Sequence, residues 1–406
     1  MKLKNNGPRP GRTRTTRAAM PAAAALAALI LLAPGIGRPV TLYEKQDFKL
    51  KLAGHLQDLT SSSEDPFFGG HVANNTQRLR LTFRALTGSV LSAEASIDTT
   101  YTFGSALDSP LFLLTKDMPP QTYFNWQRAY LDEGGRYGLI SVYRAVLTVE
   151  AEKYRVVAGR QRLAYGTALF WSPIDIWNPT GPLALEPGEK VGVDGISGTW
   201  WISDKTSATA LAAIADTWDQ ARAAASWSFQ HQSYTFDFLA GKRGRDMIYG
   251  LDFVGYVGTA GLHGEFTYTV ADQRDDYPRA VIGMDYAWKN SLYAAAEYYH
   301  NGGPLQLDLN NPLLAITALQ GATGVDTVNR NFLGLLATYD LDPLVRGSLA
   351  VIYDLDRGSE VFAPSLSWSA SGSVAVSGGG QIFRGASDGE YGSYPDLGWF
   401  RLRWDF

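Results

Sequence analysis

The residues of this sequence with the clearest chemical potential are basic side chains that recur two positions apart. We call this set the basic wall, and its members are Lys49, Lys51, Arg78, Arg80, Arg84, Arg160, Arg162, Arg401 and Arg403. Successive side chains of a β-strand point to opposite sides, so residues two apart share a face. A face of cations attracts anions without making or breaking covalent bonds. These residues therefore predict a charged surface rather than a catalytic centre.

A second set of charged and aromatic residues lies in one segment, 165–194. Its members are Trp171, Asp175, Trp177, Glu186, Glu189 and Asp194. The segment cannot continue a strand ladder, because Pro173 and Pro179 lack a backbone N–H group. Its tryptophans are too apolar for a loop that is surrounded by water. We expect the segment to fold inward and narrow a lumen, with a packed outer cap as the alternative.

Motifs for catalysis and for metal binding are missing from the sequence. There is no Cys, which excludes thiolate zinc sites, iron–sulfur clusters and attached c-type haem. The five His show no HxH or HExxH spacing, and there is no nucleophile elbow or P-loop. The 36 basic and 40 acidic residues give a slightly acidic chain, which does not favour nucleic acid. We expect no enzyme activity and no cofactor.

Strands must position the basic wall, because polar and apolar residues alternate through most of the chain. In 261–271, for example, Phe266 and Tyr268 alternate with Thr267 and Thr269. Segments of about ten residues with this pattern are typical of transmembrane antiparallel β-barrels. A soluble β-sandwich is the alternative. The sequence therefore predicts an all-β fold, a transmembrane antiparallel β-barrel with an inward-folded loop.

The number of strands follows from the alternating segments and the connections between them. We expect about 18 strands, with a range of roughly 16 to 20, because Tyr123–Leu131 also alternates. Short and long connections take turns along the chain, as periplasmic turns and extracellular loops do in outer-membrane barrels. The long connections include 59–76, 104–138 and 302–328. Tyr, Trp and Phe cluster near the expected strand ends, where aromatic rings lie at a membrane interface.

The N-terminal residues 1–37 have the pattern of a secretory signal. Basic residues precede an apolar run, 22–33, and small residues follow it. The run is too short to span a bilayer of about 30 Å, although an N-terminal membrane anchor is the alternative. We therefore expect the signal peptide to be 1–37 and the barrel to be 38–406.

Two stretches resemble Gram-negative outer-membrane porin-like barrels. The last strand, 398–406, ends in Phe406 and resembles the assembly signal of that family. The stretch from Gly159 to Pro179 resembles the motif GRQ-x3-WG followed by W-x-P-x-D-x2-NP, with Tyr165 where the motif has Trp. Barrels of this type include alginate-export-like barrels and the barrels of porin–cytochrome conduits. The resemblance implies the bacterial outer membrane, contact with its lipid and recognition by the barrel-assembly machinery.

Closing the barrel makes the first and last strands neighbours, and this brings most of the basic wall onto one side of the lumen. An Arg that faces lipid at the bilayer midplane costs about 2–4 kcal/mol, so these side chains must face the lumen. We expect a channel for passive diffusion of small hydrophilic solutes, with a mild preference for anions. The carboxylates of 165–194 either face the wall across water and create a field, or pair with it and brace it.

Other functions and partners stay open on the sequence alone. The barrel could form the sleeve of a porin–cytochrome electron conduit around a multihaem cytochrome, or it could export an anionic polysaccharide. Association into a homo-oligomer is also open.

Overall fold

The structure is a computed structural model that describes residues 39–406 except 66–68, 119–121, 180, 191 and 306–324. The expected signal peptide, 1–37, lies outside the described residues, as does most of the expected loop 302–328. In the described part of the chain, no helix is long and apolar enough to cross a membrane.

The described residues form twenty strands and two short helices. The strands are β1 (Val40–Lys45), β2 (Phe48–Glu64), β3 (His71–Thr87), β4 (Leu91–Phe103), β5 (Gln127–Glu133), β6 (Arg136–Ala151), β7 (Tyr154–Gln161), β8 (Val193–Ser203), β9 (Thr206–Ala213), β10 (Arg222–His231), β11 (Tyr234–Arg243), β12 (Asp246–Val257), β13 (Ala260–Val270), β14 (Tyr277–Ala287), β15 (Tyr293–Asn301), β16 (Asn331–Asp342), β17 (Val345–Asp354), β18 (Ser359–Ser369), β19 (Val374–Gly385) and β20 (Leu397–Asp405). The helices are the 3₁₀ helix η1 (Ser105–Asp108) and α2 (Pro110–Thr115).

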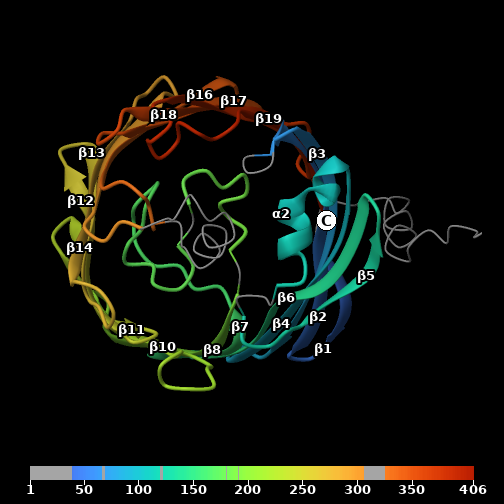
Figure 1. Cartoon of the computed structure of the whole chain (residues 1–406). Coiled ribbons are helices and arrows are strands. Elements are labelled where there is room, and N and C mark those ends of the chain that lie inside the picture. Colours follow the sequence, from blue (N-terminus) through green and yellow to red (C-terminus); the bar gives the residue numbers. More distant parts are fainter. Residues whose placement is uncertain (1–38, 66–68, 119–121, 180, 191, 306–324) are drawn as a thin grey trace, which may run out of the picture. The chain divides into compact units, whose positions relative to one another are not determined.

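Eighteen of these strands close into one antiparallel barrel. Neighbouring strands along the chain pair with each other, β4 pairs with β6, and β20 pairs with β2 to close the ring (Figure 1). Two described strands are not members of this ring, because each pairs with one strand only: β1 pairs with β2, and β5 pairs with β6. The expected fold class and strand number are confirmed.

The alternation of the sequence becomes the two faces of the barrel wall. On β13, the rings of Phe266 and Tyr268 are exposed on the outer face, whereas Thr267 and Thr269 are buried on the lumen side. The lumen side is buried because the barrel encloses part of its own chain. An apolar outer face and a polar inner face are the arrangement that a transmembrane barrel requires.

The connection expected at 59–76 is not a long loop, and that prediction was wrong. Strand β2 continues to Glu64 and β3 begins at His71, so these strands form an extended hairpin. Side-chain hydrogen bonds accompany the ladder there, with Ser61 Oγ donating to Asn74 Oδ1 at 2.6 Å. Both faces are polar in this part of the hairpin, so the sequence shows no apolar alternation even though the backbone pairing continues.

The segment 104–138 is partly ordered into regular elements. It contains η1, α2 and β5, and β5 covers the second half of the alternating stretch Tyr123–Leu131. Strand β5 pairs with the first half of β6, and β7 pairs with the second half of β6. Strand β5 therefore lies beside the same edge of β6 as β7, next to the other half of that strand. It does not add a strand to the ring of eighteen.

The chain terminus takes part in closing the barrel. The backbones of Gly54 and Phe406 exchange two hydrogen bonds, of 2.8 and 2.9 Å, and the buried Phe406 ring packs 5.0 Å from that of Trp404. A Cβ atom on Gly54 would lie 2.3 Å from the Arg80 carbonyl oxygen and 2.8 Å from the Phe406 ring. The lack of a side chain at Gly54 therefore allows β20 to approach β2.

We predict that Gly54→Ala weakens the closed barrel, because the added methyl group must displace backbone at the closing junction. The variant should lose its folded, heat-modifiable band at a lower temperature than the native chain. The matched control is Gly198→Ala, since a Cβ atom there meets no heavy atom within 4 Å. Equal melting of both variants would contradict a special role for Gly54.

Candidate functional site

The candidate site is the lumen, where one segment of the chain leaves the wall. Strand β7 ends at Gln161, and the chain returns to the wall at Val193, the first residue of β8. In between, the chain lies inside the ring of strands (Figure 1). The expected inward fold of this segment is confirmed, and we call residues 162–192 the lumen loop.

Two tryptophans pack the lumen loop against the inner wall. Trp171 stacks on Tyr299 with ring centroids 5.2 Å apart and lies 5.6 Å from the ring of Phe332. Trp177 belongs to a separate apolar cluster that includes Leu239 of β11. Both tryptophans are at most 1% exposed. The protein's apolar core therefore lies inside the barrel, between the loop and the wall.

Two buried carboxylates of the wall hold the backbone of the lumen loop. Glu265 of β13 and Glu297 of β15 are at most 2% exposed. Glu265 accepts hydrogen bonds from the N–H groups of Thr167, Ala168 and Ile174, and Glu297 accepts them from those of Leu169, Phe170 and Trp171, at 2.7–3.2 Å. These amides have left the sheet and need acceptors. The sequence shows Glu265 as a polar residue in an alternating strand, but it does not show what binds there.

Asp175 stabilises the lumen loop from within, because its contacts are with other residues of the loop. Its Oδ1 accepts hydrogen bonds from the N–H groups of Trp177 and Asn178, at 3.2 and 3.1 Å, and its Oδ2 forms an ion pair with Lys190 at 2.7 Å. The side chain is fully buried. The expectation that Asp175 faces the basic wall is not met, because the loop's own lysine neutralises it.

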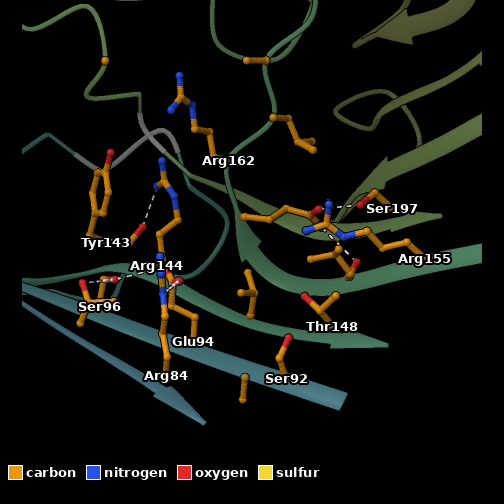
Figure 2. Close-up of a pocket in the computed structure, with 18 of the residues that line it drawn as sticks. Arg84, Ser92, Glu94, Ser96, Tyr143, Arg144, Thr148, Arg155, Arg162 and Ser197 are labelled. Atoms are coloured by element: carbon orange, nitrogen blue, oxygen red, sulfur yellow. Dashed lines mark hydrogen bonds and ion pairs between the residues drawn. The ribbon is translucent and has the colours of Figure 1, made fainter. Parts of the chain in front are cut away.

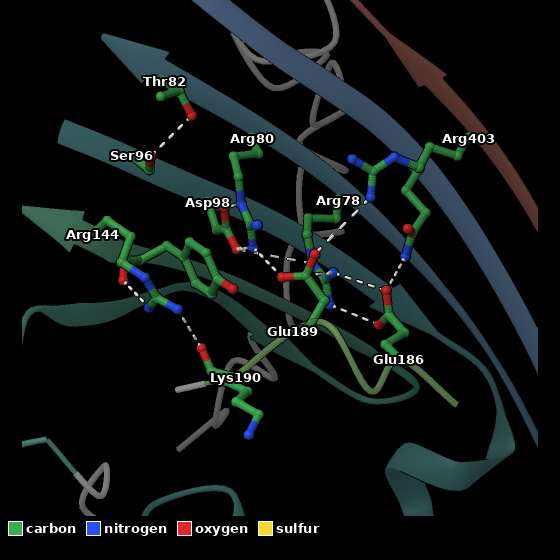
Figure 3. A network of polar contacts seen from close by, with 12 residues as sticks. Arg78, Arg80, Thr82, Ser96, Asp98, Arg144, Glu186, Glu189, Lys190 and Arg403 are labelled. Carbon is green, nitrogen blue, oxygen red and sulfur yellow. Dashed lines mark hydrogen bonds and ion pairs between the residues drawn. The ribbon is translucent and has the colours of Figure 1, made fainter. Parts of the chain in front are cut away.

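The other two carboxylates of the lumen loop reach the basic wall directly (Figure 3). Arg78 donates from both terminal nitrogens to Glu186, at 3.1 and 3.0 Å. Arg80 lies 2.8 Å from Glu189 and also forms a bidentate pair with Asp98 of β4, at 2.6 and 2.7 Å. At these positions the charges pair and brace the loop, which is the second of the two arrangements that the sequence left open.

The pairing with Arg80 controls the charge of Glu189. Burial by itself would raise the pKa of Glu189, but the hydrogen bond and the charge of Arg80 outweigh it. The pKa of Glu189 therefore lies below its ordinary value. The carboxylate is ionised near neutral pH, as the ion pair requires.

Arg160 and Asp194 do not face the lumen, contrary to expectation. Arg160 Nε lies 2.8 Å from Asp194 Oδ1, and its guanidinium also lies over the Trp126 ring, 4.7 Å from its centroid. Both side chains are buried. Gln161, the next residue, lines a lumen cavity, so Arg160 points to the other side of its strand. This pair fastens the segment before β5 to the junction of β7 and β8.

A cavity of about 830 Å³ lies between the lumen loop and the wall formed by β2, β3, β4, β6, β7, β8, β9 and β20. Its basic residues are Arg80, Arg84, Arg144, Arg155, Arg162 and Arg403. Its carboxylates, among the residues that the structure describes, are Glu94 and Glu189. We call this space the arginine cavity. It contains four members of the basic wall, whereas Lys49, Lys51, Arg78 and Arg401 lie outside its lining.

The arginines of the cavity differ in how far they are neutralised (Figure 2). Arg84 pairs with Glu94 at 2.6 Å. Arg144 donates to the carbonyl oxygens of Tyr143 and Lys190, at 2.7 and 2.6 Å, which leaves its positive charge without a paired carboxylate. Arg162 is exposed and forms no ion pair with a described residue, and its guanidinium points away from Glu94.

Sequence reasoning missed Tyr143 and Arg144, because a β-bulge brings both into the lumen. The register between β4 and β6 shifts where Ser96 pairs with Arg144 and Ile97 pairs with Val142. A bulge places an extra residue on one strand and breaks the alternation of faces. The guanidinium carbons of Arg80 and Arg144 lie 3.4 and 3.9 Å from the Tyr143 ring centroid. Strict alternation would have placed one of the two residues outside.

Metal binding finds no support in the described part of the chain. No group of three or more His, Cys, Asp or Glu side chains there could hold a metal ion. His263 lies near Glu297, with Nε2 3.2 Å from the carboxylate, and so it contributes to the anchor of the lumen loop.

We predict that Glu297→Gln loosens the lumen loop, because an amide cannot accept the three N–H groups as a carboxylate does. A hydrogen bond to a charged group contributes about 1.5–3 kcal/mol. Hydrogen exchange of the amides of 169–171 should therefore accelerate by roughly tenfold or more. The control is Glu360→Gln on β18. Unchanged exchange in Glu297→Gln would show that Trp171 packing alone holds the loop.

We predict that acid releases the tip of the lumen loop. Since the pKa of Glu189 is lowered, its contribution to loop docking is complete near neutral pH and is lost as the pH falls through the lowered value. A spin label on Gly188→Cys, where a Cβ atom meets nothing within 4 Å, should become more mobile in acid. The same label with Glu189→Gln should already be mobile at neutral pH. A label that responds to pH equally in both chains would refute this role.

The fold resembles that of known outer-membrane proteins, although the sequence does not. No protein-family model matches the sequence, and no curated protein matches it. Solved structures do resemble it: OccAB4 of Acinetobacter baumannii has a TM-score of 0.57 at 11% identity, covering 89% of this chain and 99% of that one. OccK8 (OprE) of Pseudomonas aeruginosa has a TM-score of 0.57 at 9% identity, covering 88% and 98%. The outer membrane protein opdK of P. aeruginosa has a TM-score of 0.55 at 9% identity, with the same coverage. The chain therefore shares its closed antiparallel barrel fold with these proteins.

Proposed function

We propose that this protein is a channel of the bacterial outer membrane through which small hydrophilic solutes diffuse passively, with a mild preference for anions. The apolar outer face and the fold shared with outer-membrane proteins such as opdK support the membrane location. The polar lumen supports the passage of hydrophilic solutes. No step requires energy, because the barrel offers a hydrated path rather than a moving part.

The observation that carries the anion preference is the composition of the arginine cavity. Six arginines line it in the described structure, and four of them form ion pairs: Arg80 with Asp98 and Glu189, Arg84 with Glu94, Arg155 with Glu150 and Arg403 with Asp405. Arg144 and Arg162 have no carboxylate partner there, so their charges act on whatever enters the cavity. Charged side chains that line a pore select permeating ions by sign.

The carboxylates of the lumen loop, Glu186 and Glu189, affect the pore through its width and not through their charge. Glu186 and Glu189 would repel anions if they were free, but Arg78 and Arg80 neutralise them. The loop thereby narrows the lumen without making it acidic. An anion that passes the loop then meets the unpaired charges of Arg144 and Arg162.

The lumen loop favours a channel over a sleeve for a cytochrome. Its tryptophans are buried against the wall and its backbone is bound by Glu265 and Glu297, so it occupies space that a partner inside the barrel would need. Export of an anionic polysaccharide would use the same arginines, but no observation favours a polymer over a small solute. We propose a transport function without catalysis, as the sequence indicates.

We predict that the double variant Arg144→Gln with Arg162→Gln loses anion preference. A unit charge about 4 Å away contributes about 1 kcal/mol in water, so the permeability ratio of anions to cations should fall severalfold. The measurement is the reversal potential of the purified protein in a planar bilayer under a salt gradient. Arg162→Gln alone tests the charge without disturbing the contact of Arg144 with the loop.

The control is Lys205→Gln, in the short turn between β8 and β9, which should leave the reversal potential unchanged. A channel that conducts but keeps its reversal potential in the double variant would refute the role of the cavity. A correctly folded native barrel without any conductance would refute the channel itself.

A further inference from the structure

Three carboxylates of the inner wall lie next to one another where the lumen loop docks. Asp237 of β11 pairs with Asp252 of β12, and Asp252 pairs with Glu265 of β13. Side chains directly opposite each other in antiparallel strands have Cβ atoms about 4.5–5.5 Å apart. Asp252 and Glu265 are also buried, with 4% and 2% exposure. We call these three residues the carboxylate row.

No described cation neutralises the carboxylate row. In the part of the chain that the structure describes, no Lys or Arg forms an ion pair or a hydrogen bond with any of its members. The ionisable groups of the surrounding strands and of the loop contact one another instead, namely Arg279 with Asp326, His263 with Glu297 and Lys190 with Asp175. Two buried carboxylates that share a site without a cation repel each other, which favours a proton on one of them.

The contacts of Ser172 in the lumen loop indicate which carboxylate holds this proton. Ser172 Oγ lies 2.9 Å from the carbonyl oxygen of Tyr165 and 3.0 Å from Oε2 of Glu265. A hydroxyl group has one hydrogen, and a carbonyl oxygen can only accept. No other described group donates to the Tyr165 carbonyl oxygen. Each contact therefore has a hydrogen of its own only when Ser172 donates to Tyr165 and a protonated Glu265 donates to Ser172.

The contacts of Thr167 are consistent with an ionised Asp252 beside this protonated Glu265. The Thr167 hydroxyl donates its single hydrogen to Asp252 Oδ1 at 2.6 Å, so that oxygen is an acceptor. The backbone N–H of Thr167 donates to Glu265 Oε1 at 2.9 Å, which is the oxygen without the proton. One residue of the loop thus bridges the two carboxylates, and the loop position depends on the charge of both.

Ionisation of Glu265 would disturb the docking of the loop in two ways. It would place a second negative charge directly opposite Asp252, and like charges at such positions are destabilising. The single hydrogen of Ser172 would then serve either Tyr165 or Glu265, and the other contact would become two acceptors that face each other without a hydrogen.

We infer that Glu265 keeps a proton at neutral pH and that this proton holds residues 165–174 of the lumen loop against the wall. The docked loop binds the proton more tightly than the undocked loop does, so docking is complete at neutral pH and is lost as the pH rises. The direction is opposite to that at the tip of the loop, where acid breaks the pair of Glu189 with Arg80. The inference rests on the place of the loop inside the barrel and does not depend on the solute that passes.

Infrared spectroscopy of the purified barrel tests the proton directly, because a protonated carboxyl group absorbs at a higher wavenumber than a carboxylate. The native chain should show the C=O band of a protonated carboxyl at neutral pH and lose it in alkali. Glu265→Gln should lack that band at neutral pH, whereas Glu360→Gln on β18, outside the carboxylate row, should keep it. A native folded barrel without the band, or a band that persists in Glu265→Gln, would overturn the inference.

Asp252→Asn provides a second variant that retains Glu265. Without the opposing charge Glu265 ionises more easily, so the band should disappear at a lower pH than in the native chain. An unchanged midpoint would overturn the inference as well, because the carboxylate row would then not act as a unit.

A spin label on Leu169→Cys reports the movement of the loop, since this side chain is 46% exposed and the native chain has no Cys. From neutral to alkaline pH the rotational correlation time of the label should shorten severalfold. The same label with Glu265→Gln should stay immobile, because glutamine is neutral at every pH and its amide can donate to Ser172. Tyr165 and Lys190 also titrate in alkali but are present in both chains. An equal response of both chains, or none in the native chain, would overturn the inference.

Single-channel conductance of the native chain should rise in alkali as the lumen widens, and that of Glu265→Gln should not. A folded barrel that never conducts would refute the channel proposal, while the infrared band and the spin label would still decide whether Glu265 holds the loop through its proton.

Discussion

The binding of the lumen loop by Glu265 and Glu297 is the interaction on which the internal structure depends. A segment that leaves the sheet inside a barrel carries N–H groups with no ladder partner, and an unpaired buried amide is costly. Two wall carboxylates, one on β13 and one on β15, accept six of these groups. Once this part of the loop is held, Trp171 reaches Tyr299 and the loop extends across the lumen.

The charges at the far end of the loop complete the arrangement. Glu186 and Glu189 meet Arg78 and Arg80 of β3, so the loop joins two distant parts of the wall. This pairing also divides the arginines by role. Those that pair with the carboxylates of the loop fasten it, whereas Arg144 and Arg162 retain charges that no described carboxylate neutralises. The same residue type therefore serves as a brace at one position and as a lining of the cavity at another.

The alternation of side chains made most of the wall predictable, and its failures have local causes. The hairpin at Glu64 and His71 was missed because polar residues occupy both faces there. Arg160 and Arg162 are two positions apart, but the strand ends at Gln161, two residues after Gly159, which has a φ of +115°. A Cβ atom on Gly159 would lie 2.1 Å from the Ala145 carbonyl oxygen, so only glycine fits this bend. After this bend, two residues that are two positions apart in sequence need not lie on the same face.

The sequence by itself determined the strand period, the approximate number of strands and the exit of the loop from the sheet, and it favoured the inward direction of the loop. Each of these depends on local properties, namely the alternation of polarity, the prolines and the tryptophans. Only the tertiary structure decided which charges meet. Glu297 and Trp171 are far apart in sequence, and the register of two strands at Tyr143 determines where Arg144 points. Such contacts depend on strand order and register around the whole ring, which no local pattern contains.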